Sequence, residues 1–446
     1  MTTALKTPLK TPLKTPSQTF PSKADLVRRA QAVIPGCSNS FSKGFDQYAQ
    51  SVSPHFLIKG RGARVEDVDG NSYLDFTMGL APLILGYADP DVNAAIVDQL
   101  SRGTVWSLSS PLEIELAELL VEIIPCAEMV RYGKNGSDAT TGAVRLARAY
   151  TGRDLVACCG YHGWHDWYIG TTVRNAGIPA QVSELTLTFP YNDLEAVEKL
   201  FRANPDRIAC VILEPTTVFR PAAGYLEGIK ALCRKYGALL IFDEIVTGFR
   251  LALGGAQEYF GVVPDLACFG KSMGNGVPIA VVTGRADIMK KFEDVFYSFT
   301  FAGEALGLVA SIATINKLRR EEVNAQLWAQ GNRIIERFNA MASSEGLSDR
   351  LVCVGYGPRS IIQFKTETGE EDWTLKSLFQ QECLRRGVLS LNCHNMSYAH
   401  TAEVVDQLLE VYRAVLALVS AAVASRTPLD SYLEGPALSP VFRRPM

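Results

Sequence analysis

Residues 238–245 read Ala-Leu-Leu-Ile-Phe-Asp-Glu-Ile, and residues 266–271 read Leu-Ala-Cys-Phe-Gly-Lys. Both runs are apolar and too short for helices, so each predicts a strand that is buried on both faces of a sheet. The first run leads into Asp243 and the second into Lys271. Burying a carboxylate or an amine at the end of such a strand costs free energy unless the group is paired with an opposite charge or takes part in binding or catalysis. These two stretches therefore indicate both the fold and the place to look for chemistry.

Short apolar runs alternate with helical patterns on either side of these strands. Strand patterns occur at 155–161, 209–214 and 279–283, and helical patterns occur at 111–124 and 194–204. Such alternation predicts an α/β fold with a mostly parallel sheet that is covered on both faces. Ligands of such sheets bind beyond the carboxyl ends of the strands. The residues expected at those ends are Tyr161-His162-Gly163, Glu214-Pro215, Asp243-Glu244 and Gly270-Lys271.

The two ends of the chain have other patterns. A hairpin is expected at 56–73, with Ile58 and Val65 in its two strands and a tight turn at 69–71. After Gly303 the pattern changes to long helices and short strands, which predicts a smaller C-terminal α+β domain. We therefore expect a disordered tail (1–22), an N-terminal arm and segment of the small domain (23–75), a large domain (76–304) and the small domain (305–446).

Composition limits the function class. The chain has 446 residues, 47% of them hydrophobic, and a formal net charge of -3, which is no electrostatic signature for nucleic acid or an anionic membrane. Its ten cysteines form no C-x-x-C, and its five histidines form no metal-binding motif, so no metal is expected. No apolar run is long enough to span a membrane, and the LKTP repeats near the start do not resemble a signal peptide. We expect a cytoplasmic protein that acts on small molecules.

Lys271 and Asp243 suggest a particular chemistry. Burial lowers the pKa of a lysine and yields the neutral amine that can attack an aldehyde as a Schiff base. A structural salt bridge between the two residues is the alternative.

Two further features could contact a ligand. The segment Asn135-Gly136-Ser137 precedes a helix and could bind a phosphate, although it could equally be a turn with an N-cap. Tyr161 could stack on a ring or simply belong to the core.

The order of the motifs makes a resemblance specific. The segments KNGSDATTGAVRLARAYTGR, GYHGWHDWY, VILEP, IFDEIVTGFR, PDLACFGKSMGNGVPIA and FTFAGEAL occur in succession. Together they resemble the class III pyridoxal-phosphate-dependent aminotransferases, and the nearest members are the glutamate-1-semialdehyde 2,1-aminomutase-like enzymes. The resemblance runs from about Ala30 to His400. It implies the fold-type I architecture of pyridoxal-phosphate (PLP) transferases, in which the large, PLP-binding domain has a mostly parallel, seven-stranded sheet.

The resemblance also implies roles for individual residues. Lys271 matches the lysine that binds PLP as a Schiff base and then moves protons, and Asp243 matches the carboxylate at the pyridine nitrogen. Thr300 matches a threonine that reaches the cofactor phosphate of the neighbouring subunit, which implies a homodimer with shared active sites. The cofactor would alternate between PLP and its amine form, PMP. The other expected cofactor contacts are Asn135, Gly136, Ser137, Tyr161, His162, Glu214 and Val246.

The substrate side departs from the aminomutase pattern. Residues 391–397 read LNCHNMS and lack an acidic residue, and the loop 160–168 is rich in aromatic side chains. Ser40, Trp164 and Asn395 are the candidate substrate contacts. We therefore expect transfer of an amino group from an amino-acid donor to a neutral, bulky aldehyde or ketone of a specialised or sugar-related pathway. The alternatives are a glutamate-1-semialdehyde 2,1-aminomutase, a relative that racemises or decarboxylates, and a scaffold protein without activity.

Overall fold

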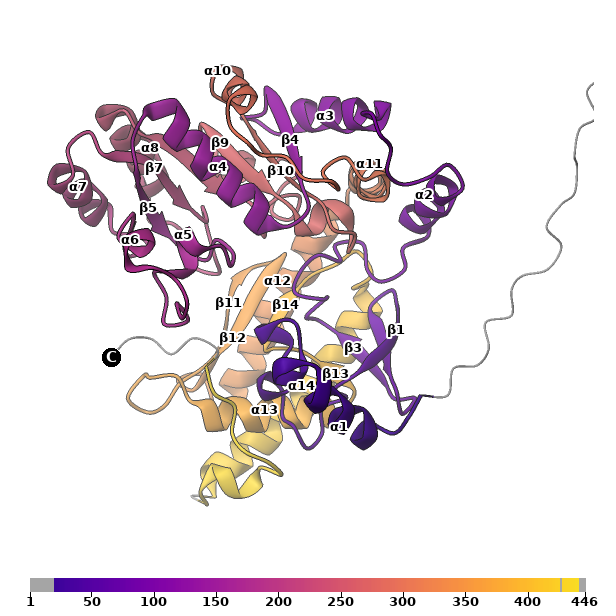
Figure 1. The fold of residues 1–446 in the computed structure, drawn as a ribbon. Helices are drawn as coiled ribbons and strands as arrows, with labels where there is room; N and C mark the ends of the chain where they lie inside the picture. The colour runs from indigo at the N-terminus through magenta and orange to yellow at the C-terminus, as the bar shows by residue number, and fades with distance from the viewer. Residues whose placement is uncertain (1–19, 426, 441–446) are drawn as a thin grey trace, which may run out of the picture.

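A seven-stranded sheet forms the centre of the larger half of the molecule (Figure 1). The computed structural model describes residues 20–425 and 427–440. Strand β10 runs antiparallel to both of its neighbours, and the other six strands are parallel to one another. The mostly parallel sheet expected from the sequence is confirmed. In spatial order the strands are β4 (Met129–Gly133), β10 (Ala280–Gly284), β9 (Leu266–Phe269), β8 (Leu239–Asp243), β7 (Ile208–Leu213), β5 (Leu155–Cys159) and β6 (Thr186–Thr188).

The strands are apolar throughout because both faces of the sheet are covered. Along β8, Leu240 and Phe242 belong to one core cluster, whereas Leu239 and Ile241 belong to another. Successive side chains of a strand point to opposite faces, so an unbroken apolar run is what a doubly covered strand requires. The helices of this half are α2 (Pro90–Leu100), α3 (Pro111–Ile123), α4 (Gly136–Thr151), α5 (Asp166–Ile169), α6 (Ala180–Ser183), α7 (Leu194–Ala203), α8 (Tyr225–Tyr236), α9 (Ala256–Phe260) and α10 (Ala286–Met289).

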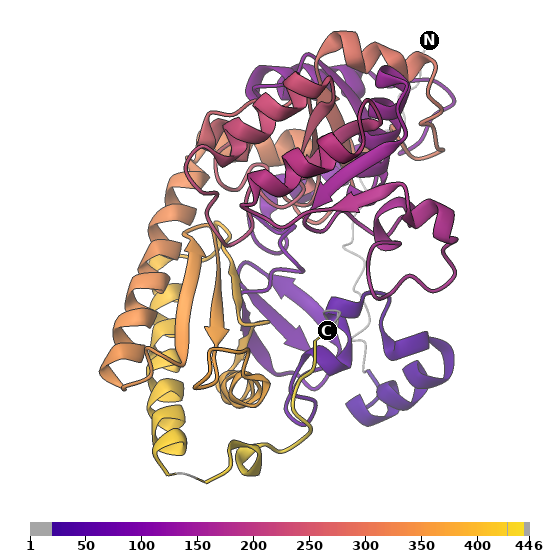
Figure 2. The same ribbon diagram turned by 90° about the vertical axis from the view of Figure 1, so that its left-hand side faces the viewer.

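The smaller half combines the two ends of the described chain (Figures 1 and 2). Strand β3 pairs in parallel with β13, which follows it by more than 300 residues along the chain. One sheet has the order β1 (Leu57–Arg61), β2 (Arg64–Asp67), β3 (Ser72–Asp75) and β13 (Val388–Leu389), and the other has β11 (Leu351–Tyr356), β12 (Arg359–Phe364) and β14 (Cys393–Asn395). The helices of this half are α1 (Lys23–Val33), α12 (Val323–Ser344), α13 (Trp373–Arg385) and α14 (Ala402–Ala424), whereas α11 (Ala305–Arg320) lies against the larger half.

The expected hairpin at 56–73 is a three-stranded meander instead. Ile58 and Val65 do lie on adjacent antiparallel strands, but the tight connection between them is at Gly62, which has φ +58°. The turn at 69–71 joins β2 to β3. The sequence rule missed the first turn because its Gly-Ala pair is not one of the usual hairpin signals. Residues 1–19 of the expected disordered tail lie outside the described residues. Ser22, near the end of that expected tail, caps α1, because its side chain accepts a hydrogen bond from the N–H of Asp25.

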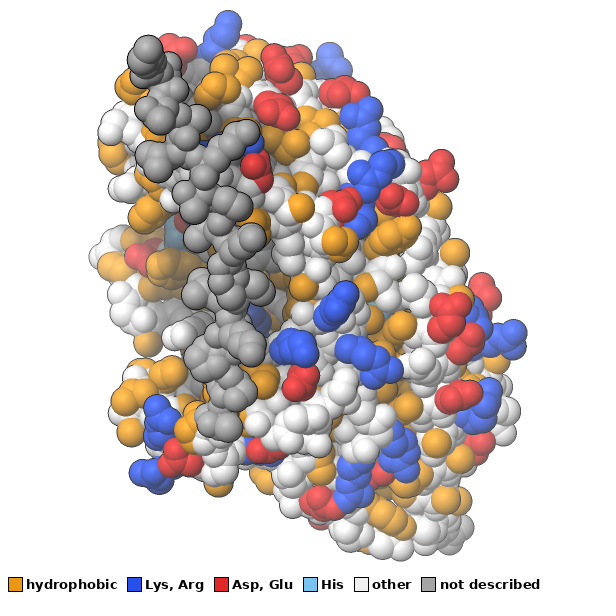
Figure 3. All heavy atoms as spheres, turned by 90° about the vertical axis from the view of Figure 1, so that its right-hand side faces the viewer, with side chains coloured by type: hydrophobic (Ala, Val, Ile, Leu, Met, Phe, Trp, Pro, Cys, Tyr) orange, Lys and Arg blue, Asp and Glu red, His pale blue; other side chains and the backbone are white. Residues whose placement is uncertain are grey.

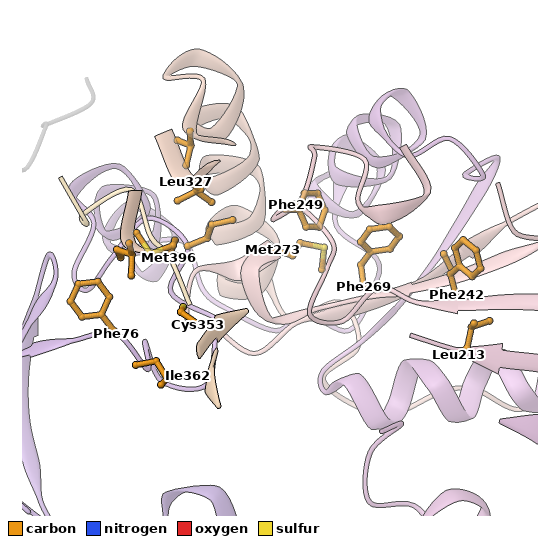
Figure 4. Packing of buried hydrophobic residues seen from close by; sticks show 14 of the residues in the cluster. Phe76, Leu213, Phe242, Phe249, Phe269, Met273, Leu327, Cys353, Ile362 and Met396 are labelled. Carbon is orange, nitrogen blue, oxygen red and sulfur yellow. The ribbon is translucent and has the colours of Figure 1, made fainter. Parts of the chain in front are cut away.

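A continuous apolar core joins the two halves (Figure 4). It runs from Phe242 and Phe269 in the large sheet, past Met273 and Leu327, to Ile362 in the small one. Helix α11 packs against both α2 and α3 and leads directly into α12. The strand ends of the large sheet are therefore held in a fixed relation to β12 and β14.

Helix α14 is the one helix in the described part of the chain that is long and apolar enough to cross a membrane. It packs against α12 and α13, and Leu408, Tyr412 and Val415 are buried there. Its apolar length is thus explained by packing inside the small half. On the face drawn in Figure 3, acidic and basic side chains are interspersed, and neither sign forms a continuous patch.

Candidate active site

Asp243 is the last residue of β8, and its carboxylate is paired with a histidine. Its Oδ2 lies 2.8 Å from Nδ1 of His162, and its Oδ1 accepts a hydrogen bond from the N–H of Ile245 at 3.1 Å. The Nε2 atom of His162 lies 3.1 Å from the carbonyl oxygen of Cys159, at the end of β5. Asp243 is 4% exposed, and His162 is 1% exposed. The sheet therefore presents a buried carboxylate whose orientation is fixed by two neighbours.

Lys271 follows β9 at the same edge of the sheet. Burial, and after it the positive charge of Arg359, lowers the pKa of its amine from 10.5 to about 8. Lys271 has φ +41°, a left-handed conformation that is strained for any residue other than glycine. Within residues 20–425 and 427–440, neither a hydrogen bond nor an ion pair reaches its amine, so the salt bridge to Asp243 that the sequence left open is not formed. The amine is available to react.

The N-terminus of α4 lies beside these strand ends. Asp138 Oδ2 accepts hydrogen bonds from the N–H groups of Lys134 and Asn135, at 3.1 and 2.7 Å, and so closes the turn that leads into the helix. In the described part of the chain, the N–H groups of Gly136 and Ser137 have no partner. Two free N–H groups at the positive end of a sixteen-residue helix suit a phosphate.

The loop after β5 is packed tightly against that helix end. Ser137 Oγ accepts a hydrogen bond from the N–H of Trp164 at 3.2 Å. Gly163 has φ +103°, and a Cβ atom there would lie 2.2 Å from Ser137 Oγ. Only glycine allows this approach. The indole ring of Trp164 is 67% exposed and touches His165 edge-on, with the ring centroids 4.6 Å apart.

Tyr161 offers an open aromatic face at the end of β5. Its side chain is 53% exposed, and its backbone N–H donates to Glu214 Oε1 at 3.0 Å. Glu214, an expected cofactor contact, is thereby held beside the end of β5. Val246 follows β8 and is partly buried. A flat ring could lie against Tyr161 without displacing another side chain.

The remaining expected residues lie on other segments of the chain. Ser40 precedes the short 3-10 turn Phe41–Lys43 and is partly exposed. Thr300 is exposed in the loop before α11. Asn395 is buried on β14, and its Nδ2 donates to the carbonyl oxygen of Thr77 at 2.9 Å. Among the described residues, no three His, Cys, Asp or Glu side chains gather as a metal site requires.

Two arginines near Lys271 were not singled out from the sequence. Arg250 is fully buried, and its guanidinium donates to the carbonyl oxygens of Met396 and Ala81, at 2.7 and 2.8 Å. Burial, followed by the charge of Arg359, lowers the pKa of Arg250 to about 9. The signal for Arg250 was present, because it closes the apolar motif IFDEIVTGFR. Arg359 is the first residue of the mostly apolar strand β12. A single arginine at the start of an apolar run is the only feature of the sequence that could have drawn attention to this residue.

Residues 47–409 match the sequence profile of the family described as Aminotransferase class-III. The chain belongs to the class-III aminotransferases. The chain is therefore a PLP-dependent enzyme of this family. The likeness inferred from the six ordered motifs is confirmed at the level of the family.

Curated relatives cover nearly the whole described chain. A 3-aminobutyryl-CoA aminotransferase from Cloacimonas acidaminovorans is 36% identical over 404 residues, which are 88% of this chain and 96% of the relative. A glutamate-1-semialdehyde 2,1-aminomutase from Natranaerobius thermophilus is also 36% identical, over 88% of this chain and 97% of its own. Among solved structures, the PLP-bound FumI protein of Sphingopyxis sp. MTA144 has a TM-score of 0.84 at 29% identity and covers 92% of this chain and 99% of its own. The fold-type I architecture is confirmed.

Proposed function

We propose that this class-III enzyme moves an amino group from an amino-acid donor to an aldehyde or ketone of a specialised or sugar-related pathway. The observation that carries the proposal is the pair of strand ends described above, where a reactive amine at Lys271 and a buried carboxylate at Asp243 close neighbouring strands of one sheet. The relative from Cloacimonas is named as an aminotransferase, which supports transfer between two molecules.

PLP is the cofactor, and the residues at the sheet edge fit it. The free N–H groups of Gly136 and Ser137 suit its phosphate, and the open face of Tyr161 suits its ring. Lys271 suits its aldehyde, and Asp243 suits its pyridine nitrogen. When bound, PLP supplies a carbonyl that amines can attack and a ring that withdraws electrons from the substrate carbon.

The chain's own residues then have separate tasks. Lys271, with a pKa of about 8, is partly neutral near neutral pH, so it can act as a nucleophile and later accept or return a proton. Asp243 holds a negative charge at a fixed position, because His162 and the N–H of Ile245 orient both carboxylate oxygens. A preorganised charge of this kind stabilises a developing positive charge without reorganisation.

The second candidate is a glutamate-1-semialdehyde 2,1-aminomutase, in which the amino group moves within one molecule. The relative from Natranaerobius supports it about as well, since it covers the same share of this chain at the same identity. The substrate side favours the first candidate, because residues 391–397 lack the acidic residue of the aminomutase pattern. The exposed Thr300 supports a homodimer with shared active sites, and a cytoplasmic location is part of the proposal.

One comparison separates the two candidates. The purified enzyme is given glutamate 1-semialdehyde alone, and in parallel aldehydes and keto-sugars with glutamate or alanine as donor. We expect donor-dependent product and a graded preference for neutral, bulky acceptors, because apolar and stacking contacts discriminate by only about 1 to 3 kcal/mol per group. Efficient formation of 5-aminolevulinate without a donor, together with no donor-dependent reaction, would replace the aminotransferase proposal with the aminomutase one.

A further inference from the structure

Arg359 begins β12, and the register of that strand fixes the direction of its side chain. It pairs with Asn395 of β14, and the next pair is Ser360 with His394. Ser360 Oγ and His394 Nδ1 are 2.8 Å apart in the buried core. Because side chains alternate along a strand, Arg359 and Asn395 lie on the opposite face. That face meets the segment after β3, where Asn395 Nδ2 donates to Thr77 O.

The same strand end is tied to the neighbourhood of Lys271. The guanidinium of Arg250 donates to Pro358 O at 3.3 Å and also lies 3.3 Å from Ser272 Oγ. Pro358 directly precedes Arg359, and Ser272 directly follows Lys271. One buried guanidinium thus holds the start of β12 within side-chain reach of the reactive amine.

The charge of Arg359 has no partner in the described ranges, 20–425 and 427–440. No hydrogen bond or ion pair reaches its guanidinium, and its Nη1 is shielded from solvent with nothing to donate to. Arg350, another partly buried arginine, pairs with Asp372 at 2.8 Å. A shielded donor without an acceptor is uncommon and costly, and one near a reactive group is expected to meet a ligand. After burial, Arg359 also has the largest effect on the pKa of Lys271.

We propose that Arg359 binds the carboxylate of the amino donor while the donor's amine meets the cofactor at Lys271. The inference rests on the proposed function, because it assigns the donor side of that reaction. A guanidinium presents two parallel N–H groups that match the two oxygens of a carboxylate. Asn395, its cross-strand neighbour, borders the same face.

The kinetic test uses the holoenzyme and the Arg359→Gln variant with two kinds of donor. L-Alanine and L-glutamate carry a carboxylate, whereas 1-phenylethylamine and isopropylamine do not. For the first pair we expect kcat/KM to fall about 10- to 100-fold, mostly through KM, which is the size of a charge-assisted hydrogen-bond loss. For the second pair we expect a change of less than about threefold. The control is Arg333→Gln, which removes an exposed ion pair with Asp406 and should leave kcat/KM unchanged for both pairs of donors.

A binding measurement gives a readout other than turnover. Calorimetry with propanoate and glutarate, which carry no amine, should give a Kd at least about tenfold higher for Arg359→Gln than for the wild type. The Kd of Arg359→Lys should lie between those of the wild type and Arg359→Gln, because lysine keeps the positive charge but lacks the paired N–H groups of a guanidinium. This conservative variant also replaces Arg359→Gln if circular dichroism shows that the latter fails to fold.

Three results would overturn the inference. The first is that Arg359→Gln loses kcat/KM equally for every donor. The second is that Arg359→Gln binds both carboxylate probes with the Kd of the wild type. The third is that the wild type accepts only amines without a carboxylate. An equal loss would mean that Arg359 acts through the pKa of Lys271 alone. A wild type without any donor-dependent transfer would instead refute the proposed function, and the two carboxylate probes would still decide whether Arg359 binds an anion.

Discussion

The Nδ1 atom of His162 lies 2.8 Å from Asp243 Oδ2, while Nε2 of the same ring lies 3.1 Å from the carbonyl oxygen of Cys159. Both neighbours are acceptors as long as Asp243 is ionised, so both ring nitrogens must carry a proton. The positive ring and the carboxylate then form a buried pair. In that state His162 compensates the buried carboxylate of Asp243.

Replacing His162 by leucine should therefore leave an unpaired charge in the core. Loss of one partner of a buried pair costs about 3 to 5 kcal/mol, so we expect the free energy of unfolding of His162→Leu to fall by about that amount. The double variant His162→Leu/Asp243→Asn carries no buried charge and should recover part of the loss. Urea unfolding of the two variants checks this. Equal stability of the two would show that Asp243 does not carry its charge in the folded protein.

Asp243→Asn alone should fold, because a neutral histidine can hydrogen-bond to the amide. We expect the variant to retain PLP but to lose turnover by about 10² to 10⁴-fold, since a neutral group no longer stabilises positive charge on the cofactor ring. The measurement is kcat with the cofactor content determined in the same sample. Near-normal turnover would refute the assigned role of Asp243.

Lys271→Ala should leave a folded protein that cannot bind PLP covalently. In the wild type, the pKa of about 8 predicts that the rate of covalent PLP loading rises with pH through a midpoint near 8, because only the neutral amine attacks the aldehyde. Stopped-flow absorbance of the cofactor-free protein from pH 6 to 10 measures this profile. A midpoint near the ordinary value for lysine, about 10.4, would contradict the environment described for Lys271.

Gly163→Ala tests the approach of the loop to α4. The new methyl group would overlap with Ser137 Oγ, so the helix end should shift and PLP affinity should fall about tenfold or more. Gly152 is the matched control, because it has φ +68° at the other end of α4 with no atom within 4 Å of a Cβ. Gly152→Ala should cost about 1 kcal/mol of stability and leave PLP affinity unchanged, as measured by equilibrium dialysis.

The sequence predicted the strand ends well because their physical cause is local. The runs that end at Asp243 and Lys271 are apolar at every position, and only a doubly covered strand requires this. The rule that ligands bind at carboxyl ends then selected the edge of the sheet at which Asp243, His162 and Lys271 lie in the structure. The first turn of the meander at Gly62 escaped because its local sequence resembles no preferred turn type.

The partners of the site residues could not be predicted in the same way. His162 and Asp243 are separated by 81 positions, and their contact depends on the order β8, β7, β5 in the sheet. Arg359 lies farther still along the chain, on a different sheet, and its position depends on how Arg250 joins the two halves. Contacts of this kind follow from packing between distant segments, for which a single sequence contains no direct signal.

Acid stability gives the last prediction, and it rests on His400. Its ring stacks on Phe76 with the centroids 4.1 Å apart, Nδ1 accepts from Ser397 N–H, and Nε2–H donates to Asp75 O, each at 3.0 Å. Protonation would direct a second N–H at the N–H of Ser397. Burial above all, with a contribution from the charge of Arg250, lowers the pKa of His400 to about 4.

The sign follows from proton counting. Unfolded His400 has a pKa of about 6.5 and folded His400 one of about 4, so between these values the unfolded chain binds more protons. Its contribution to stability is complete above about pH 6.5 and is lost as the pH falls toward 4, at up to about 1.4 kcal/mol per pH unit. Urea unfolding at several pH values should show this slope in the wild type. His400→Gln should be less stable at pH 7 but should lose stability less steeply below pH 6.5, and an unchanged slope would mean that His400 is already protonated in the folded protein.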